Sequence, residues 1–553
     1  MPHLNLGHVR ADSTPSRWKP ISYLTLALAG LLTGASAWAE ADTLGNKQID
    51  TRPVLEQMQP STLPAGWQKG AFMEVFVRAY KDSDGDGMGD LKGLIQQLDY
   101  LKDLGIKGIW LMPITANADG DHGYATTDFR AIDPRYGTLD DFDELVRQAH
   151  ARGIGVIMDY VINHSARQHP LFVSAQKGPT SPFYDWYVWD KEAPTGWDIW
   201  GKNPWTVTPQ GSYFGTFGPH MPDFNFKNPA VLAYHQSSLR FWLNRGLDGF
   251  RLDAVPHLVE NSAKDWNDQP ESRRLTADLR ALITNYPQRY VVCEATAKPQ
   301  DYAAPEVCGS AFAFGLERQI VKAAQGERTA IQALADYFTI APPSMATFVA
   351  NHDIFAGERL WDQLRGNRAQ YKLAAASYLL QPGTPFIYYG EEIGMAGIKG
   401  LPGDGPLRAP MRWTAERQRG GFTTGTPFRP ASPNAARYNV AAQLADPKSL
   451  LSFYKSMLRL RNTLPSLASG SYDAPQVQGR VMAHRRTLGA ETTLVVINYG
   501  TKPGRITLRA LPSHGLLKPA YPMAAKTATV NAHGSVSLVL PAQSVQVHTV
   551  QPR

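Results

Sequence analysis

Hydrophobic positions along most of the chain follow two periodicities in turn, and this predicts alternating strands and helices. Short apolar runs of strand length occur at residues 73–80 (MEVFVRAY), 106–113 (IKGIWLMP) and 154–161 (IGVIMDYV). Segments with helical spacing separate them, at residues 91–105 and 138–153. The second of these segments opens on Thr138 with acidic residues behind it and closes on Gly153, which are signals of a helix start and end.

The alternation is interrupted once and then resumes. Residues 165–222 are rich in Pro, Gly and aromatic residues and show no long periodicity, so they predict an inserted subdomain. Beyond them, helical patterns alternate with the apolar runs GFRLDAV (249–255), YVVCEA (290–295), MATFVANHD (345–353) and PFIYYGEE (385–392). Strand–helix alternation repeated about eight times predicts the α/β class and a parallel (β/α)₈ TIM barrel. A doubly wound sheet is the competing fold, but no glycine fingerprint for a nucleotide is present.

The pattern changes again near Gly470. Strict alternation appears in RVMAHRRT (480–487), TTLVVINY (492–499), RITLRAL (505–511) and SVSLVL (535–540), with turn residues between them. This predicts a C-terminal antiparallel β domain. The predicted organisation is a linker at 40–69, a barrel at 70–467 that contains the insert 165–222, and a β domain at 468–553.

The N-terminus resembles a targeting segment. Arg10, Arg17 and Lys19 precede the apolar run 21–32, and Ala37-Trp38-Ala39 has the small-x-small form of a cleavage site. We interpret residues 1–39 as a signal peptide cleaved after Ala39. A membrane anchor is the alternative, but the apolar run is short for a spanning helix. The sequence therefore predicts a secreted or periplasmic protein that does not contact the membrane after cleavage.

Composition excludes few classes of protein. The 553 residues are 43% hydrophobic and 19% charged, as in ordinary globular proteins. The net charge of +7 is spread along the chain without long Lys/Arg runs, so nucleic-acid binding is not predicted. A monomer is expected. Cys293 and Cys308 are the two cysteines, and either a disulfide or two reduced buried thiols fits them.

Polar residues stand at the ends of four predicted strands, where they would be costly unless paired. They are Asp159, Asn163 and His164; Arg251, Asp253 and His257; Glu294; and His352 and Asp353. Ion pairing inside the barrel mouth would explain any one of these carboxylates. Because strand ends of a barrel meet at one face, four of them together favour an active site.

These four segments resemble the four signature regions of the α-amylase family of retaining glycoside hydrolases. MPDFN (221–225) resembles a fifth motif of that family, in a form intermediate between the oligo-1,6-glucosidase and neopullulanase groups. The resemblance extends from about residue 70 to the end of the chain. It implies Asp253 as nucleophile, Glu294 as general acid/base, and Asp353 as a third acid that holds sugar hydroxyls.

The resemblance also implies the residues around the reacting sugar. Arg251 lies two residues before Asp253, hence on the same side of a strand, and should keep Asp253 ionised. Glu294 must instead begin protonated, and its neighbours along the strand supply no cation to oppose this. The implied substrate-binding residues are Arg251, Tyr124, which would stack on the glucose, and His122, His164, His257 and His352.

The acidic stretch DSDGDGMGDLKGL (82–94) predicts a metal loop. An EF-hand is excluded because its twelfth position requires Glu and Gly93 stands there. The resemblance implies a structural Ca²⁺, or Mg²⁺, held by Asp82, Asp84, Asp86, Asp90 and the Met88 carbonyl; a solvated turn is the alternative. A second calcium site at Asn163 and the His257 carbonyl is a further hypothesis whose other ligands are not identified.

Specificity is the least determined property. Exo-acting relatives usually place an Asp before the Gly-Tyr pair and an Arg three residues after the third acid, and this pair blocks the site beyond the terminal glucose. Here His122 and Ala356 stand at those positions, and Arg359 comes later. The sequence therefore favours an open cleft and an α-amylase-like enzyme that cleaves α-1,4 bonds of starch or malto-oligosaccharides by double displacement.

Two alternatives remain open on the sequence alone. One is an α-glucosidase or a glucosyl-transferring or isomerising enzyme on short oligosaccharides, and the other is an inactive sugar-binding relative. Aromatic residues of the insert leave a second question open. They could stack on sugars or form the core of a small subdomain; they are Trp186, Trp189, Trp197, Trp200 and Trp205.

Overall fold

The computed structural model describes residues 49–552, so the predicted signal peptide lies outside the described residues. Seven parallel strands form the wall of a barrel: β1 (Phe72–Val75), β2 (Gly108–Leu111), β5 (Gly155–Tyr160), β9 (Gly249–Leu252), β10 (Tyr290–Cys293), β11 (Ala346–Thr347) and β12 (Thr384–Tyr388). Their hydrogen-bonded order is β10-β9-β5-β2-β1-β12-β11. This arrangement confirms the predicted (β/α)₈ barrel.

At the eighth position of the wall, two isolated bridges take the place of a strand. Between β10 and β11, Ala311 pairs in parallel with Cys293, and Phe312 pairs in parallel with Ala346. These two bridges join the edges of the sheet. The apolar pattern around them is too short to predict a strand, so the sequence analysis identifies no strand here.

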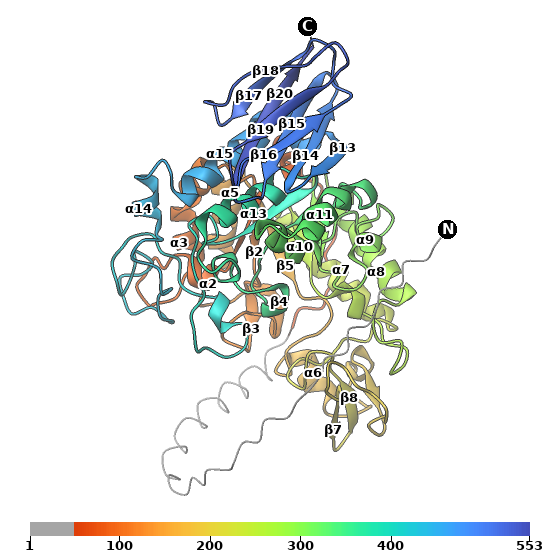
Figure 1. Cartoon of the computed structure of the whole chain (residues 1–553). Helices are drawn as coiled ribbons and strands as arrows, with labels where there is room; N and C mark the ends of the chain where they lie inside the picture. Colours follow the sequence, from red (N-terminus) through yellow and green to blue (C-terminus); the bar gives the residue numbers. More distant parts are fainter. Residues whose placement is uncertain (1–48, 553) are drawn as a thin grey trace, which may run out of the picture. The chain divides into compact units, whose positions relative to one another are not determined.

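Helices cover the outside of this wall (Figure 1). The longer ones are α5 (Leu139–His150), α7 (Pro229–Asn244), α8 (Pro270–Asn285), α10 (Leu316–Ala324), α11 (Arg328–Ile340), α13 (Arg368–Leu379) and α15 (Leu450–Thr463). The shorter ones include α9 (Pro299–Tyr302), α12 (Leu360–Gln363), α14 (Val440–Leu444) and α16 (Pro465–Ser469). Helix α5 begins as predicted, because Thr138 and Asp141 each accept a backbone N–H from the other in a capping box.

Two predicted elements are shorter than expected. The predicted helix 91–105 is divided at Gln97 into α3 (Leu91–Gln96) and α4 (Leu98–Leu104). The predicted strand 73–80 ends at Val75, and a short helix α2 (Val77–Tyr80) follows it. Both segments are apolar enough for either structure, so the pattern alone did not locate the breaks.

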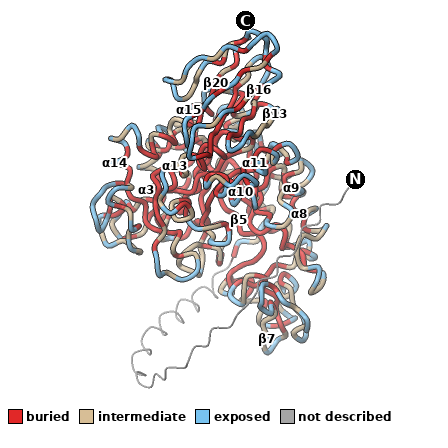
Figure 2. Tube along the Cα trace, in the orientation of Figure 1, coloured by how far each residue is buried: buried red, intermediate tan, exposed pale blue. Residues whose placement is uncertain are grey.

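Aromatic side chains fill one end of the barrel. Phe72 stacks on Phe386 with ring centroids 4.9 Å apart, and Trp110 lies 5.2 Å from Phe312. The strands that carry them are buried (Figure 2). This packing leaves the opposite end, where the strands finish, for polar side chains.

The insert after β5 forms a separate small unit with its own sheet. It contains α6 (Pro170–Ala175) and the strands β6 (Trp189–Asp190), β7 (Trp205–Thr208) and β8 (Gly211–Phe214) in the order β6-β8-β7. Trp189 packs on Tyr184 and Tyr213, and Trp197 packs on Trp205. Trp186 is buried and Trp189, Trp197 and Trp205 are partly buried among other rings, whereas Trp200 is 62% exposed.

The C-terminal region is an antiparallel β domain, as predicted. One sheet has the order β13-β14-β15-β20-β17-β18 and a two-stranded sheet pairs β16 with β19. The strands are β13 (Ser471–Gln478), β14 (Val481–Leu488), β15 (Glu491–Asn498), β16 (Gly504–Leu508), β17 (Leu516–Tyr521), β18 (Ala528–Thr529), β19 (Val536–Leu540) and β20 (Ser544–Gln551). The domain packs against α11 and α13 (Figure 1), and Tyr499 shares a 2.6 Å hydrogen bond with Ser377 of α13. Within residues 49–552, no helix has the length and apolarity needed to cross a bilayer.

Candidate active site

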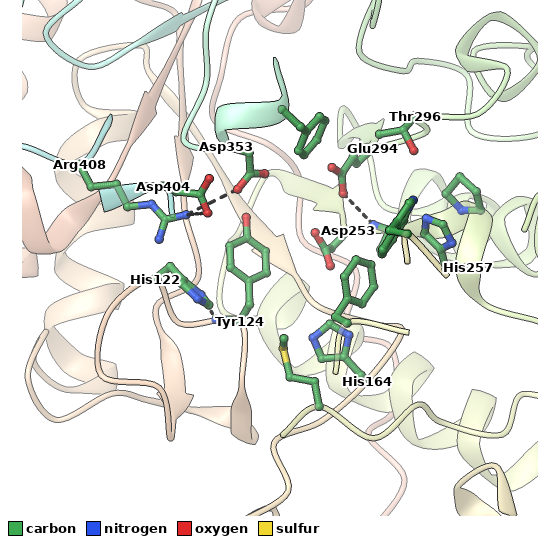
Figure 3. A pocket seen from close by; sticks show the side chains of 16 residues that line it. His122, Tyr124, His164, Asp253, His257, Glu294, Thr296, Asp353, Asp404 and Arg408 are labelled. Atoms are coloured by element: carbon green, nitrogen blue, oxygen red, sulfur yellow. Dashed lines mark hydrogen bonds and ion pairs between the residues drawn. The ribbon is translucent and has the colours of Figure 1, made fainter. Parts of the chain in front are cut away.

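A pocket of about 530 Å³ lies at the ends of the barrel strands (Figure 3). It brings together all three predicted acids, Asp253, Glu294 and Asp353. Four of the predicted substrate-contacting residues also line it: His122, Tyr124, His164 and His257. The other two, Arg251 and His352, are fully buried behind the pocket wall.

Strand β9 carries Arg251 and Asp253 into the site and must run very close to β10. At Gly249, the first residue of β9, an added Cβ would lie 1.7 Å from the Tyr290 carbonyl oxygen of β10. Only glycine fits this approach. Beyond Asp253 the chain turns through Ala254 in a left-handed conformation, with φ of 49°. This turn directs the Ala254 N–H to Glu294 Oε2 at 3.0 Å.

The Arg251 guanidinium is the electrostatic centre of the site. It contacts Asp159 Oδ1 at 2.9 Å and Glu294 Oε2 at 3.1 Å, and it also donates to Asp253 Oδ1. Glu294 therefore has a cation beside it, although its neighbours along its own strand supply none, as expected. The cation reaches Glu294 from the neighbouring strand, and a linear sequence shows only neighbours along the same strand.

Burial and crowding set the protonation of this cluster. Burial raises the pKa of Asp253 well above its ordinary value, the Arg251 cation lowers it, and the nearby Glu294 raises it. Burial also raises the pKa of Asp159 to about 6, against lowering by Arg251 and the Tyr124 hydroxyl. Arg251 thus acts on Asp253 in the predicted direction, but burial outweighs it. One cation shared by three carboxylates leaves negative charge uncompensated, which adds to burial in keeping the pKa values of Asp159 and Asp253 above their ordinary values.

His352 links strand β1 to the pocket. Its Nδ1 lies 2.6 Å from Glu74 Oε1, and its Nε2 lies 2.7 Å from the Tyr124 hydroxyl and 3.2 Å from Asp353 Oδ2. Tyr124 in turn donates to Asp159 Oδ2 at 2.9 Å. Burial lowers the pKa of His352 well below its usual range, so the ring is neutral. Glu74 was not predicted, although a charged residue inside an apolar run was a usable signal.

The remaining predicted histidines are also held neutral. Burial lowers the pKa of His164 to about 3 and that of His257 to about 4. Within the described residues, His164 Nε2 and His257 Nδ1 are buried without a hydrogen-bond partner. His122 lies in the loop between β3 (Thr115–Asn117) and β4 (Thr126–Ile132), where its Nδ1 accepts the Tyr124 N–H. Neutral rings with unused nitrogens suit the binding of uncharged hydroxyl groups.

The other end of the pocket carries charges that the sequence analysis did not predict. Arg408 lies 3.3 Å from Asp121, 3.5 Å from Asp353 and 3.2 Å from Asp404, and Arg429 lies 2.8 Å from Asp121. The Asp–Arg pair looked for at positions 122 and 356 is absent, since His122 and Ala356 stand there. A different pair, Asp404 and Arg408, lines the pocket, and Asp121 pairs with Arg408 from behind it.

The structure also shows the contacts of Arg359 and the pairing of the two cysteines. Arg359 does not reach the pocket, because it is buried and donates to the carbonyls of Tyr389 and Leu407. Cys293 and Cys308 form a disulfide, which ties the end of β10, next to Glu294, to the segment before Ala311.

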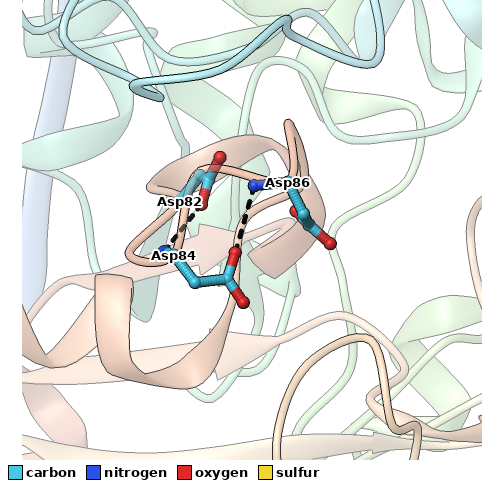
Figure 4. Close-up of side chains that lie close together, drawn as sticks. All are labelled: Asp82, Asp84 and Asp86. Atoms are coloured by element: carbon cyan, nitrogen blue, oxygen red, sulfur yellow. Dashed lines mark hydrogen bonds between the residues drawn. The ribbon is translucent and has the colours of Figure 1, made fainter.

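The acidic loop gathers three of its four carboxylates. Ligand atoms of Asp82, Asp84 and Asp86 lie within 4.8 Å of one another (Figure 4). Burial, and then the charges of the neighbouring aspartates, raise the pKa of Asp86. Asp90 is engaged elsewhere: it caps α3 by accepting the Gly93 N–H, and it also accepts the Ser83 N–H. Three crowded carboxylates are a donor set that fits a hard divalent cation.

A parallel (β/α)₈ barrel with three acids in one pocket at its strand ends has the form of a barrel enzyme. Similarity to known proteins identifies the family. Residues 74–470 match the family model described as the alpha amylase catalytic domain. The chain belongs to the α-amylase family of glycoside hydrolases.

Named relatives differ in their reactions. The chain is 35% identical over 448 residues to alpha-amylase 3 of Dictyoglomus thermophilum, covering 78% of this chain and 85% of the relative. It is 36% identical over 471 residues to the trehalose synthase/amylase of Mycolicibacterium smegmatis, covering 74% and 79%. The trehalulose synthase of Pseudomonas mesoacidophila, at 27% identity, superposes with a TM-score of 0.75 over 88% of this chain and 100% of that one.

Replacing Arg251 with Met tests its role as the shared cation. The variant leaves three buried carboxyl groups uncompensated, so the free energy of unfolding at pH 7 should fall by about 3–5 kcal/mol. Without the cation the folded-state pKa values of Asp159 and Asp253 rise further above their unfolded values. The folded state then loses stability as pH rises through them. Urea unfolding at pH 5, 6.5 and 8 should therefore show a deficit that grows with pH.

Arg245→Met is the matched control, because Arg245 pairs with Asp143 at the surface with side chains 26% and 44% exposed. It should cost less than about 1 kcal/mol at every pH. An Arg251→Met deficit that is the same at pH 5 and pH 8 would contradict the shared-cation account.

Proposed function

We propose that this protein is a retaining enzyme that cleaves terminal α-glucosidic bonds of short malto-oligosaccharides and disaccharides and passes the glucosyl group to water or to a second sugar. The observation that carries this proposal is the ion-pair network of Arg408 with Asp121 and Asp404. It borders the pocket on the side of Asp353, opposite Glu294 (Figure 3). A charged pair at that end would close the pocket beyond one terminal glucose and exclude a continuing chain. It therefore favours end-wise action over the open cleft.

Geometry supports a division of labour between the two central acids. Asp253 Oδ1 is held by Arg251, which leaves Oδ2 to attack C1 of the glucose. Glu294 Oε2 accepts the Ala254 N–H and faces Arg251, which leaves Oε1 to carry the proton for the departing oxygen. Attack by Asp253 and proton transfer from Glu294 break the glycosidic bond and form a covalent glucosyl-enzyme. Glu294 then takes a proton from water or from an acceptor hydroxyl, whose oxygen attacks C1, breaks the bond to Asp253 and restores the α-configuration.

The third acid positions the glucose. Asp353 faces Arg408 through Oδ1 and His352 through Oδ2. Burial, and then Glu294, raise the pKa of Asp353 to about 7, while Arg408 lowers it. Asp353 together with neutral His164 and His352 would bind the sugar's hydroxyls and hold the ring in a distorted form. Tyr124, which stacks on His352, would face the ring.

We also propose a structural divalent cation in the acidic loop, Ca²⁺ or alternatively Mg²⁺, held by Asp82, Asp84 and Asp86. The family resemblance adds the Met88 carbonyl and Asp90. When bound, the ion would neutralise the clustered carboxylates. The loop is joined to the segment that leads to Arg429, because Asp82 N donates to Phe422 O and Gly87 O accepts from Phe428 N. An ordered loop would thus support the charged end of the pocket.

Export is a further part of the proposal. The pattern of residues 1–39 supports it, as does the disulfide between Cys293 and Cys308, because disulfides persist in oxidising compartments. We propose a secreted or periplasmic enzyme whose substrate is a soluble α-glucoside.

Products from maltoheptaose test the proposed specificity. End-wise action should release glucose one unit at a time, with maltohexaose as its early partner and the α-anomer of glucose formed first. Chromatography of samples taken during the first few per cent of conversion, with proton NMR for the anomer, measures both. Maltose and maltotriose as early products would overturn the end-wise proposal and restore the open cleft.

Replacing Asp253 with Asn tests the nucleophile. Turnover of maltose should fall by roughly four orders of magnitude, since no carboxylate is left to form the covalent intermediate. The melting temperature should not fall, because the amide oxygen can still accept from Arg251 and one buried carboxyl is removed. A variant that retains more than about a tenth of wild-type turnover would exclude Asp253 as nucleophile.

Chelation tests the metal proposal without using activity. Excess EDTA should lower the melting temperature by about 5–10 °C, and added Ca²⁺ should restore it. In the variant with Asp84→Asn and Asp86→Asn, the melting temperature should not respond to EDTA or to Ca²⁺. A wild-type melting temperature that is unchanged by EDTA would contradict a stabilising ion.

A further inference from the structure

One exposed aromatic residue of the insert, Trp200, lies at the mouth of the pocket. We propose that Trp200, with Phe217, His257 and Trp266, forms a stacking platform for the second sugar ring, the leaving group in cleavage and the acceptor in transfer. The ligand class is a pyranose that presents an apolar C–H face. This inference rests on the proposed function and adds to it where the acceptor binds.

The backbone at Trp200 is unfavourable for this residue type. Ile199 and Lys202 pair across a two-residue hairpin, with N–O distances of 2.8 and 3.0 Å. The corners are Trp200, with φ of 51°, and Gly201, with φ of 81°. Such a turn requires left-handed conformations at both corners and prefers Asn-Gly, whereas a bulky side chain at the first corner is strained. Local folding therefore does not explain the tryptophan.

Packing of the subdomain does not explain it either. Trp200 is far more exposed than Trp186, of which 9% is accessible. Its ring contacts are with Phe217 at 5.7 Å, His257 at 5.6 Å and Trp266 at 5.5 Å. His257 is itself stacked on Trp266, with an interplanar angle of 12°. Trp200, Phe217 and His257 all line the pocket.

The platform lies at the end of the pocket where the departing group must leave. Figure 3 shows Arg408, Asp404 and His122 on one side and Glu294, Thr296 and His257 on the other. Since the proposed proton donor is Glu294, the ring attached to the departing oxygen lies on the side of Glu294 and His257. Trp200 touches His257. The C–H face of a sugar can then pack on the exposed ring while its hydroxyls stay in water.

This arrangement has a kinetic consequence. Once the glucosyl-enzyme has formed, water and a sugar compete for C1. A platform that retains a sugar next to Glu294 raises the local concentration of acceptor hydroxyls. Removal of the ring should therefore reduce transfer more than it reduces formation of the glucosyl-enzyme.

The test uses α-glucosyl fluoride as donor and maltose as acceptor. Fluoride is too small to reach the platform, so its release reports formation of the glucosyl-enzyme alone. The split between free glucose and trisaccharide reports the partition between water and acceptor. Trp200→Asn should lower the ratio of trisaccharide to glucose by roughly tenfold at a fixed maltose concentration. Its melting temperature should equal or exceed that of the wild type, because Asn-Gly suits this turn.

Two further variants sharpen the comparison. Trp200→Phe keeps a ring at the same corner and should recover most of the transfer. Val207→Ala removes an exposed apolar side chain, 74% accessible, from β7 of the same subdomain. Val207 does not line the pocket, so this variant should keep the wild-type ratio.

The outcomes separate the two proposals. A wild-type protein that releases no fluoride would refute the proposed function. Fluoride release with no trisaccharide in the wild type, or with an equal ratio in the wild type and Trp200→Asn, would overturn the platform and leave the function standing. A lowered ratio in Trp200→Asn that Trp200→Phe restores is the result we expect.

Discussion

One buried cation, the guanidinium of Arg251, is the constraint on which the geometry of the pocket depends. It contacts Asp159, Asp253 and Glu294, which come from three adjacent strands of the barrel. Buried carboxyl groups are tolerated when they share a cation and hydrogen bonds, and the shared cation holds them at short range. Because one positive charge serves three acids, burial still raises the pKa values of Asp159 and Asp253 above those of freely solvated carboxyls. The same contact that permits burial thus holds Asp253 and Glu294 at the short range that their proposed roles require.

The two ends of the pocket differ in physical character. Arg408, Asp121 and Asp404 form a charged network on the side of Asp353. Aromatic rings of Trp200, Phe217 and His257 lie at the other end. A charged end can hold the hydroxyl-rich edge of a terminal sugar, whereas an aromatic end can take the flat face of a second ring. The polarity of the pocket is thus the basis of the end-wise cleavage that we propose.

Segments outside the barrel wall complete the site. The acidic loop after α2 is hydrogen-bonded to residues 422–428, and Arg429 next to them pairs with Asp121. The insert after β5 supplies Trp200 and Phe217. Neither contribution follows from the barrel itself. The barrel sets the position of the reacting acids, and the added segments determine what can approach them.

Sequence alone determined the barrel class, the C-terminal β domain, and the residues at the four strand ends. It could do so because strand-length apolar runs, helix caps and strand-end acids are local patterns, formed by residues close together in the chain. It did not reveal the two bridges at Ala311 and Phe312 that join the edges of the wall, because so short a segment has no periodicity.

Tertiary structure alone decided which charges meet. Asp121 and Arg408 are 287 residues apart, and Arg251 reaches Glu294 from a neighbouring strand. It also decided that Trp200 lines the pocket while Trp186 is buried and Trp189, Trp197 and Trp205 are partly buried against other rings of the subdomain. These are contacts between segments distant in the chain, and their energies depend on burial and distance. The sequence pattern contains neither burial nor distance. It therefore predicted which acids belong to the site but not which residues contact them.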